Sequence, residues 1–410
     1  MNDPMSKKDR FQIPWTRAKN STIFLGNGKE YIDFTSGVIL ANVGHGHTNI
    51  IKRIQARLYD PLLHCYKYPF PDKTLLSEKL LALTNRSFAE LCYCVSGTEA
   101  IETALRICNR VNPNKTIISF TDGFHGKSLG AGTISDAFRH QLPEWAQHAN
   151  WVKIVSFPSD GMISQRVLEF LEKEKGNVSG IVIECIQGSS LKKIDVAFLK
   201  KAAQICTRND IVLIIDEIQT GFYRLGLPFA YMEYDIQPNM ICIGKGLTSS
   251  LPLAAVLFDS TTAPFYKADI DCSTHAANPL SVAAALACVE IYGAKKFQNH
   301  LSSVQVEYTA QMKSLGDLLL PAIVHCYYGT LFGGLIFPKS MASVADDFVS
   351  RCMDRGLFIA RPVGKWKNIV KFVPPLSIER QELTKGFSIA REAARASGIL
   401  TEKSQKFAKS

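Results

Sequence analysis

Residues 211–219 read Ile211-Val212-Leu213-Ile214-Ile215-Asp216-Glu217-Ile218-Gln219, and residues 239–247 read Asn239-Met240-Ile241-Cys242-Ile243-Gly244-Lys245-Gly246-Leu247. Each stretch contains an apolar run typical of a buried strand. The first run ends in an acid, Asp216, and the second ends in Lys245 between two glycines. Because ligands of parallel sheets bind beyond the carboxyl ends of the strands, these two side chains are expected to lie close together.

An acid and a lysine at strand ends suit pyridoxal 5'-phosphate (PLP). This cofactor needs a lysine amine that forms a Schiff base with its aldehyde, and a carboxylate that keeps its pyridine nitrogen protonated. Lys245 and Asp216 are the candidates for these two roles. Neither residue alone would indicate a cofactor site, because apolar strands often end in Asp and a lysine between glycines is usually a loop lysine. The prediction therefore depends on further parts of a PLP site.

The composition is that of a globular protein with a large core. The chain has 410 residues, of which 46% are hydrophobic and 20% charged, which leaves room for more than one domain. No apolar run reaches the length of a membrane span, and the first eight residues lack the hydrophobic segment of a signal peptide. Eleven cysteines without a framework pattern predict reduced thiols and a cytoplasmic setting.

The formal net charge of +10 comes from Lys and Arg residues dispersed along the chain. We find no zinc-finger, RNP-type or other nucleic-acid motif, so we expect a lysine-rich solvated surface and no nucleic-acid or membrane partner. Such a surface would attract anionic small molecules.

The order of apolar and amphipathic stretches predicts an α/β fold. Candidate strands alternate with stretches long enough for helices, which is typical of a mostly parallel sheet covered by helices. The candidate strands are 116–120, 180–185, 211–216, 240–243 and 253–257, and the helices include 98–109 and 196–207.

A smaller α+β domain is expected after Phe297, with a helix, strands around 329–337, a helix near 344–355 and a strand at 369–372. The predicted division is an N-terminal segment over 1–55 that joins the small domain, a large PLP-binding domain over 56–296 and a C-terminal small domain over 297–410. Residues 403–410 have the composition of a polar tail.

A phosphate-binding helix start is predicted at Ser96-Gly97-Thr98-Glu99, directly after the strand-like run 91–95. Ser96 and Glu99 have the spacing of a capping box. The free N–H groups and the positive dipole end of such a helix suit a phosphate group. Gly97 allows close approach of the backbone, and the Thr98 hydroxyl adds a donor. An ordinary capped helix is the alternative.

Other polar and aromatic residues follow the predicted strands. Phe124 lies past strand 116–120, where an aromatic ring can stack on a flat heteroaromatic cofactor; a core phenylalanine is the alternative. His125 is expected either at the cofactor or on a loop backbone. Glu184 and Gln219 are expected near the ring oxygen of PLP or the reacting carbon, and Thr274 can reach a phosphate.

A metal site is an alternative use of the histidines and cysteines. Cys92 and Cys94 alternate in a predicted strand and so share one face, most simply a core face. His45 and His47 lie in a glycine-rich loop, and His64 and Cys65 lie further along. No metal site is predicted.

In this order the motifs resemble those of the class III aminotransferases, a subgroup of the fold-type I PLP enzymes. The resemblance runs from about Asp33 to Leu376, and the acid-plus-lysine pair within it is highly specific. The matching pieces are Gly44-His45-Gly46-His47, Ser96-Gly97-Thr98-Glu99-Ala100, Phe124-His125-Gly126, the run from Asp216 to Gly226, Gly244-Lys245-Gly246-Leu247, Ser273-Thr274, Asn278-Pro279-Leu280 and Pro374-Pro375-Leu376.

The resemblance implies a large domain with a mostly parallel seven-stranded sheet and a smaller α+β domain. It implies a PLP-dependent aminotransferase that moves an amino group from an amine or amino acid, ω-amino acids included, to a keto acid or aldehyde by a ping-pong mechanism. Lys245 would hold the cofactor and act as general acid and base in the 1,3-prototropic shift, while Asp216 would pair with the pyridine nitrogen.

The resemblance also implies the other cofactor contacts. The phosphate would be bound by Gly97 and Thr98 beside Ser96, the ring would stack on Phe124, and the ring hydroxyl would meet Gln219. The threonine that matches Thr274 comes from the neighbouring subunit in this family, which implies a homodimer with composite sites.

Several positions depart from the pattern of the family. After Glu184 the family often has Gln-Gly-Glu, whereas this chain has Gln187-Gly188-Ser189, which removes a gating glutamate. Lys371 occupies the slot of an arginine, and lysine lacks the bidentate fork that fits a carboxylate. We predict that Lys371 helps to bind a substrate carboxylate, with a surface lysine on an edge strand as the alternative. Tyr66 is a second candidate on the substrate side.

Two other functions stay open at this point. Racemases, epimerases and aminomutases occur within the same broad family and use the same lysine and acid, so a PLP-dependent isomerase is the alternative enzyme. A binding protein with a degenerate PLP site is disfavoured by the intact lysine, acid and phosphate-binding motif.

Overall fold

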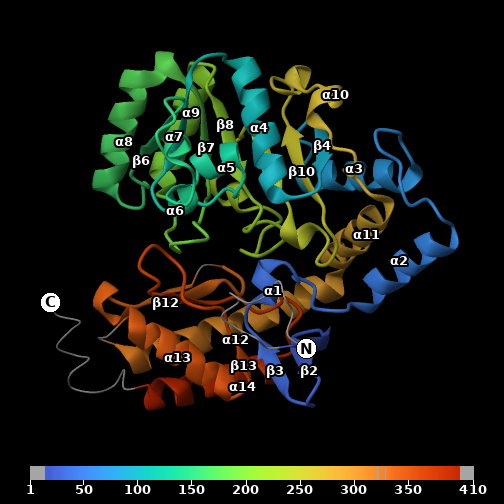
Figure 1. Ribbon diagram of the computed structural model, residues 1–410, viewed down its shortest axis with the longest axis vertical. Coiled ribbons are helices and arrows are strands. Elements are labelled where there is room, and N and C mark those ends of the chain that lie inside the picture. Colours follow the sequence, from blue (N-terminus) through green and yellow to red (C-terminus); the bar gives the residue numbers. More distant parts are fainter. Residues whose placement is uncertain (1–13, 321–322, 328, 398–410) are drawn as a thin grey trace.

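The elements of the protein form two bodies, one above the other in Figure 1. The computed structural model describes residues 14–320, 323–327 and 329–397, without the side chains of residues 325–327. The predicted polar tail at 403–410 lies outside the described residues. None of the helices in the described ranges is long and apolar enough to cross a membrane.

The upper body contains a seven-stranded sheet. Strand β10 is antiparallel to both of its neighbours, β4 and β9, whereas the five strands from β9 to β6 run parallel to one another. This confirms the predicted mostly parallel sheet. The order across the sheet is β4 (Glu90–Cys94), β10 (Ala254–Phe258), β9 (Met240–Ile243), β8 (Val212–Asp216), β7 (Val178–Ile183), β5 (Thr116–Phe120) and β6 (Val152–Val155).

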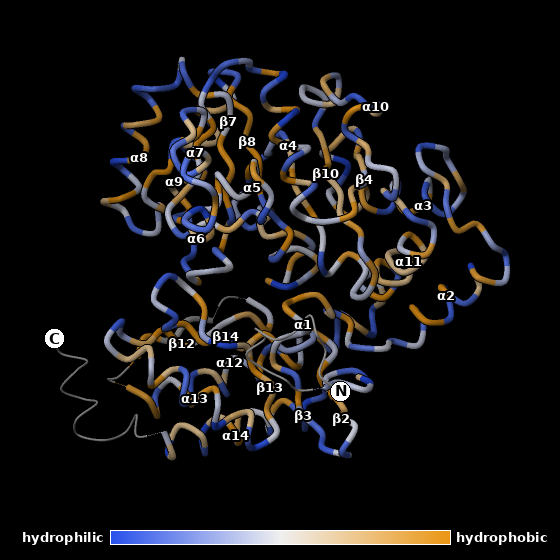
Figure 2. Tube along the Cα trace, in the orientation of Figure 1, coloured by the Kyte–Doolittle hydropathy of each residue, from blue (hydrophilic) through white to orange (hydrophobic). Residues whose placement is uncertain are grey.

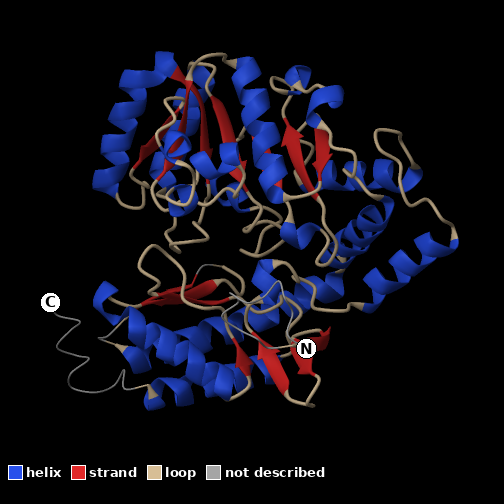
Figure 3. Cartoon of the chain, in the orientation of Figure 1, coloured by secondary structure: helices blue, strands red, loops and turns tan. Residues whose placement is uncertain are grey.

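Helices cover both faces of this sheet, which therefore lies in the middle of the upper body (Figure 3). Every residue of β7, β8, β9 and β10 is buried, as expected for strands enclosed on both faces. Figure 2 shows β7 and β8 as hydrophobic segments. The helices of this body are α3 (Pro71–Leu83), α4 (Gly97–Val111), α5 (Leu129–Thr133), α6 (Asp136–Arg139), α7 (Glu144–Gln147), α8 (Gly161–Glu174), α9 (Val196–Arg208) and α10 (Ala268–Asp271).

The lower body joins both ends of the described chain. Strand β13 (Leu357–Phe358) pairs in parallel with β3 (Glu30–Asp33), next to β2 (Thr22–Leu25) and β1 (Trp15–Lys19). A second sheet has the order β11 (Val324–Tyr327), β12 (Gly333–Ile336) and β14 (Ile369–Phe372), so β14 is an edge strand. The helices here are α12 (Lys295–Leu319), α13 (Ala342–Asp354) and α14 (Arg380–Ala396).

Helices α2 (Thr48–Tyr59) and α11 (Pro279–Gly293) lie beside the two bodies and pack against each other. The fully buried Arg224 links the bodies, since its guanidinium donates to the carbonyl oxygen of Pro374 at 2.7 Å and to the side-chain oxygen of Asn42 at 2.6 Å. Next to it, the short turn α1 (Ser36–Ile39) has positive φ angles throughout. Single 3₁₀ turns are η1 (Lys175–Asn177), η2 (Ala230–Tyr234), η3 (Lys245–Leu247), η4 (Ala263–Phe265) and η5 (Lys339–Met341).

The predicted strands 116–120, 240–243 and 369–372 have the bounds of β5, β9 and β14. Strand β7 begins two residues before the prediction and ends at Ile183 instead of Cys185. The ladder with β8 ends at the pair of Ile183 and Ile215. The next residue, Glu184, accepts hydrogen bonds from the backbone N–H groups of Phe124 and Gly188.

Candidate active site

A cavity of about 280 Å³ opens at the carboxyl ends of the central strands. Its walls contain nine of the ten residues predicted to bind the cofactor, all except Thr274. The lining residues are Ser96, Gly97, Thr98, Phe124, His125, Gly126, Lys127, Glu184, Asp216, Ile218, Gln219 and Lys245. The site therefore forms where ligands of open α/β sheets bind.

Lys245 reaches the cavity from the first residue of η3, after the fully buried strand β9. Its φ angle of 42° is unusual for a residue other than glycine; such conformations cost free energy and cluster at functional sites. Burial lowers the pKa of its amine below the ordinary value, although the charges of Asp216 and Glu184 oppose this shift. A lowered pKa increases the fraction of neutral amine, which is the nucleophilic form.

Asp216 is the last residue of β8 and is held from two sides. Its Oδ2 lies 2.8 Å from Nδ1 of His125, and its Oδ1 accepts a hydrogen bond from the N–H of Ile218 at 3.0 Å. Burial alone would lower the pKa of His125, but the hydrogen bond and the charges of Asp216 and Glu184 outweigh it and raise the pKa. His125 thus binds Asp216 rather than only a loop backbone.

The predicted helix start is present at the N-terminus of α4. The Oγ of Ser96 accepts from the N–H of Glu99 at 3.2 Å, as the capping-box spacing predicts. The carboxylate of Glu99 accepts a hydrogen bond from the N–H of Val95 at 2.8 Å. A full capping box would use the N–H of Ser96, one residue later. The amides of Gly97 and Thr98 have no acceptor within the helix, so the first turn can bind an anion.

Glu184 binds backbone rather than filling the cavity. One of its oxygens accepts from the N–H of Phe124 at 3.1 Å, and the other accepts from the N–H of Gly188 at 2.9 Å. Burial raises the pKa of Glu184, and the charge of His125 opposes the shift. The carboxylate therefore fixes the segment that carries Phe124 at the cavity wall.

The residues fit PLP, and Gln219 supplies a specific test. Its side-chain nitrogen is buried and has no hydrogen-bond partner among the described residues. A buried donor of this kind needs an acceptor, because leaving it unpaired costs free energy. The ring hydroxyl oxygen of PLP is an acceptor of the required type, in a cavity that also presents an amine, a carboxylate and an anion-binding helix start.

Lys371 lies on the edge strand β14, but its ammonium turns inward. Its Nζ donates to the carbonyl oxygen of Gly188 at 3.0 Å. Burial lowers the pKa of Lys371 to about 8, helped by the charge of Lys245 and opposed by that of Glu184. Lys371 does not line the 280 Å³ cavity, and Gly188 connects it to residues that do.

Thr274 and Tyr66 do not line the cavity within a single chain. Thr274 is exposed in the segment between α10 and α11. Tyr66 lies in the loop after α2, where its ring contacts the ammonium of Lys67 at 5.1 Å from the centroid.

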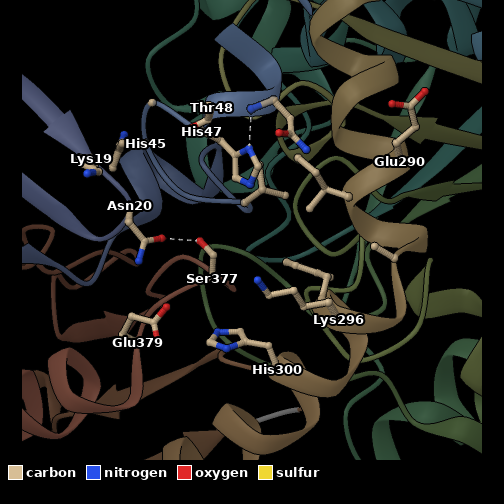
Figure 4. Close-up of a pocket in the computed structure, with 16 residues that line it drawn as sticks. Lys19, Asn20, His45, His47, Thr48, Glu290, Lys296, His300, Ser377 and Glu379 are labelled. Carbon is tan, nitrogen blue, oxygen red and sulfur yellow. Dashed lines mark hydrogen bonds between the residues drawn. The ribbon is translucent and has the colours of Figure 1, made fainter. Parts of the chain in front are cut away.

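A larger cavity of about 570 Å³ lies away from Lys245, between the start of α2 and the junction of α11 and α12 (Figure 4). The histidines considered as metal ligands have other roles here. His47 caps α2 by accepting from the N–H of Asn49 at 3.2 Å, and His45 lies 2.8 Å from Asp33. No cluster of three or more metal-ligating side chains occurs among the residues that the structure describes.

The sequence analysis assigned no role to Ile218 and Gly126, which also line the cavity. A Cβ atom on Gly97 would lie 2.9 Å from the side chain of Ile218, and a Cβ on Gly126 would lie 2.8 Å from the hydroxyl of Thr98. A Cβ atom at either glycine would therefore displace a neighbouring side chain. For Gly126 the sequence offers a signal, because this glycine directly follows Phe124 and His125, which were both predicted to lie near the cofactor.

Comparison with known proteins shows the family of this chain. Residues 5–393 match the family aminotransferase class III, so this chain belongs to the class III aminotransferases, which depend on PLP. It is an enzyme that transfers amino groups.

The acetylornithine aminotransferase of Clostridium acetobutylicum is 26% identical, with 95% of this chain and 98% of that protein covered. The diaminobutyrate–2-oxoglutarate transaminase of Wolinella succinogenes is 29% identical, with 93% and 92% covered. Among solved structures, taurine:2-oxoglutarate aminotransferase from Bifidobacterium kashiwanohense, in complex with PLP and glutamate, aligns with a TM-score of 0.85 at 20% identity over 94% of this chain and 92% of that one.

Proposed function

We propose that this aminotransferase binds its cofactor in the 280 Å³ cavity, with Lys245 as the covalent anchor and Asp216 as the partner of the pyridine nitrogen. One observation carries the proposal: the Lys245 amine, the Asp216–His125 pair and the first turn of α4 share one cavity. When bound, PLP supplies an electron sink that makes the C–H bond beside the substrate amine acidic.

Asp216 keeps a proton on the pyridine nitrogen by presenting a negative charge to it. The hydrogen bond with His125 and the N–H of Ile218 hold the carboxylate in one orientation. The raised pKa of His125 favours the protonated imidazole, in which Nδ1 is a hydrogen-bond donor toward Oδ2 of Asp216. His125 is therefore a positioning residue for Asp216.

Lys245 has two tasks in this proposal. Its Nζ holds the cofactor before the substrate amine replaces it, and afterwards it moves a proton between the two carbons of the 1,3-shift. A general base works best when its pKa lies near the working pH. Burial of Lys245 lowers its pKa in that direction.

The remaining cavity residues orient the cofactor. The N-terminus of α4, with Ser96, Gly97 and Thr98, binds the phosphate, as helix N-termini do. Phe124 stacks on the ring, and the unpaired side-chain nitrogen of Gln219 donates to the ring hydroxyl. Glu184 contributes by fixing the backbone of Phe124.

We also propose a homodimer in which Thr274 and Tyr66 complete the site of the partner. Thr274 is exposed and lies outside the cavity of its own chain. The end of α2 and the loop after it project from the body in Figure 1 and expose apolar side chains, a feature of interaction surfaces. Leu58, Tyr59, Leu63 and Tyr68 are 52%, 90%, 51% and 73% exposed.

The domain division 1–55, 56–296 and 297–410 is part of the proposal. It is supported by the pairing of β3 with β13, which joins the N-terminal segment to the C-terminal body. We further propose a cytoplasmic enzyme, because the ten cysteines whose side chains the structure describes are all free thiols.

For the substrates, we infer an amino donor with an anionic group at the end opposite its amine, and a keto acid acceptor. The names of the similar proteins support this, since acetylornithine, diaminobutyrate and taurine each carry an amine remote from an acid group. Lys371 and Tyr66 are the candidate substrate-binding residues.

The test is borohydride reduction of the purified enzyme, followed by peptide mapping. We expect the reduced cofactor on Lys245, and we expect Lys245→Ala to lose both the label and nearly all turnover. Label on Lys371, the other buried amine near the site, would contradict the assignment. A panel of amines, ω-amino acids and α-amino acids with pyruvate or 2-oxoglutarate then identifies the donor, and release of a keto product excludes an isomerase.

A further inference from the structure

The short helix α10 ends in a buried carboxylate, that of Asp271, which lies outside the 280 Å³ cavity. A fully buried acid is almost always paired, and two arginines of α4 pair with this one. The guanidinium of Arg110 donates to Oδ2 at 2.6 Å and to Oδ1 at 3.0 Å, and Nε of Arg106 donates to Oδ1 at 3.1 Å. The contact with Arg110 is bidentate, which fixes the relative position of the two side chains.

The same ion pairs also hold the backbone around α10. Oδ2 of Asp271 accepts from the N–H of Lys267 at 2.9 Å, and Arg110 donates to the carbonyl oxygen of Phe265 at 3.0 Å. Burial alone would raise the pKa of Asp271, but the hydrogen bonds from the two arginines and from the N–H of Lys267 outweigh it and lower the pKa. The carboxylate is therefore ionised at neutral pH and fastens residues 265–271 to α4.

This anchor stands three positions before Thr274. Residues 272–278, between α10 and α11, belong to no helix or strand, so the position of this segment depends on the contacts at its two ends. At the far end, Asn278 caps α11 by accepting from the N–H of Leu280 at 3.0 Å. At the near end, the charged contacts are those of Asp271 with Arg106 and Arg110.

Helix α4 connects the anchor to the cofactor site. Its first turn, with Thr98, lines the 280 Å³ cavity, whereas Arg106 and Arg110 lie one turn apart on one face of its second half. At 1.5 Å per residue, Arg110 lies about 18 Å beyond Thr98 along the helix axis. One helix thus presents amides to the phosphate of its own subunit and holds the segment that is proposed to reach the phosphate of the partner.

We propose that Asp271 is a positioning residue for the cofactor site of the partner subunit: its ion pairs with Arg106 and Arg110 fix the segment that carries Thr274. The affinity of one subunit for PLP then depends on an ion pair in the other subunit. This rests on the proposed function, because it presumes a homodimer in which Thr274 completes the partner's site. It goes beyond that function by naming the residues that set the position of Thr274.

The experiment compares two hybrid dimers of identical composition, each with one Asp271→Asn and one Lys245→Ala substitution. In the first hybrid both substitutions are in one chain, so the site that keeps Lys245 receives Thr274 from the Asp271→Asn subunit. In the second hybrid the substitutions are in different chains, so that site receives Thr274 from a subunit with Asp271 intact. Each hybrid is freed of cofactor, titrated with PLP and reduced with borohydride, and the label on Lys245 is measured by peptide mapping.

We expect Kd for PLP to be at least about fivefold higher in the first hybrid than in the second, because a displaced Thr274 loses its hydrogen bond to the phosphate. Pyridoxal, which lacks the phosphate, should label both hybrids alike. A general loss of stability would affect the two hybrids equally, since their composition is the same. Asp269→Asn is the matched control: it removes an exposed carboxylate from the same short helix and should leave the two arrangements equal.

Equal Kd values for PLP in the two Asp271→Asn hybrids would overturn the inference, and so would a difference that pyridoxal shares. Thr274→Ala in the same two arrangements shows which proposal has failed. If Thr274→Ala separates the hybrids and Asp271→Asn does not, the composite site stands without Asp271. If Thr274→Ala does not separate them, or if the chains form no dimer, the composite site falls and the inference with it.

A second variant covers the case in which Asp271→Asn subunits do not fold. Arg110→Lys keeps the positive charge but loses the bidentate contact with Asp271, and it should separate the two hybrids by at least about twofold. Equal hybrids with Arg110→Lys would then overturn the inference.

Discussion

Gly188→Ala should weaken PLP binding without unfolding the protein. Gly188 lies where three residues of the site meet: its N–H donates to Glu184, its carbonyl oxygen accepts from Lys371, and Gln219 occupies the space of its missing side chain. A Cβ atom would lie 2.1 Å from the side-chain oxygen and 2.5 Å from the side-chain nitrogen of Gln219. Since non-bonded heavy atoms prefer about 3.5 Å, the amide nitrogen must move by roughly 1 Å and the amide oxygen by roughly 1.4 Å.

The expected changes in stability and in PLP affinity follow from the displacement of the Gln219 amide. The clashing atoms are the far end of a flexible side chain, so the free energy of unfolding should fall by less than about 1 kcal/mol, below the usual cost of overpacking a core. The displaced amide, however, loses its hydrogen bond to the cofactor, which contributes about 0.5–1.5 kcal/mol. At about 1.4 kcal/mol per tenfold, Kd for PLP should rise roughly two- to twelvefold.

The assay is titration of the PLP-free protein with PLP, followed by the visible absorbance of the bound cofactor. Gly176→Ala is the matched control, because a Cβ there meets nothing within 4 Å. In a Gln219→Ala background the space is empty, so Gly188→Ala should add no further loss. The reasoning is refuted if Gly188→Ala binds PLP like wild type, or if its loss is the same with and without the Gln219 side chain.

Three further predictions concern the catalytic residues, the dimer and pH. Asp216→Asn should keep the fold and bind PLP but transaminate very slowly in single-turnover measurements, because an amide cannot hold the pyridine proton as well; an unchanged rate would make Asp216 a structural strand end. Mixed Lys245→Ala and Thr274→Ala subunits should form hybrid dimers with one normal site, so activity should recover once subunit exchange is verified, and no recovery would exclude a composite site. With a pKa of about 8 for Lys371, set by burial, by Lys245 and by Glu184, its charged form is present below pH 8 and lost above it. KM for an anionic donor should therefore rise above pH 8 in wild type more than in Lys371→Arg, and parallel profiles would contradict this.

The sheet and the gathering of its strand-end residues in one cavity were predictable, because local pattern and position coincide there. Strands buried on both faces are continuous apolar runs, so β5 and β9 could be bounded from composition alone. The acid and lysine at strand ends then had to meet, because the topology brings parallel strand ends to one edge. The short helices α5, α6 and α7 have no comparable period and were not predicted.

The hydrogen-bond partners of the site residues were less predictable from the sequence than the strands that carry these residues. Glu184 was expected near the cofactor or the reacting carbon, yet both of its oxygens bind backbone N–H groups from two different loops. Lys371 was predicted to help bind a substrate carboxylate, with a surface lysine on an edge strand as the alternative. The folded chain shows an edge-strand residue whose ammonium donates to the carbonyl oxygen of Gly188, 183 residues away. Such contacts depend on how loops return to the sheet, which residue periodicity does not encode.

The pairing of β3 with β13 has a consequence for how the protein is made. These two strands are separated by about 325 residues, from Ile32 to Leu357. At a synthesis rate of about 5–20 residues per second, the first strands wait roughly 15 to 65 s on the ribosome before their partner exists. The seven-stranded sheet, whose strands lie between Glu90 and Phe258, is complete long before. The upper body can therefore fold first, while the edge of β3 stays open to chaperones until the last part of the chain emerges.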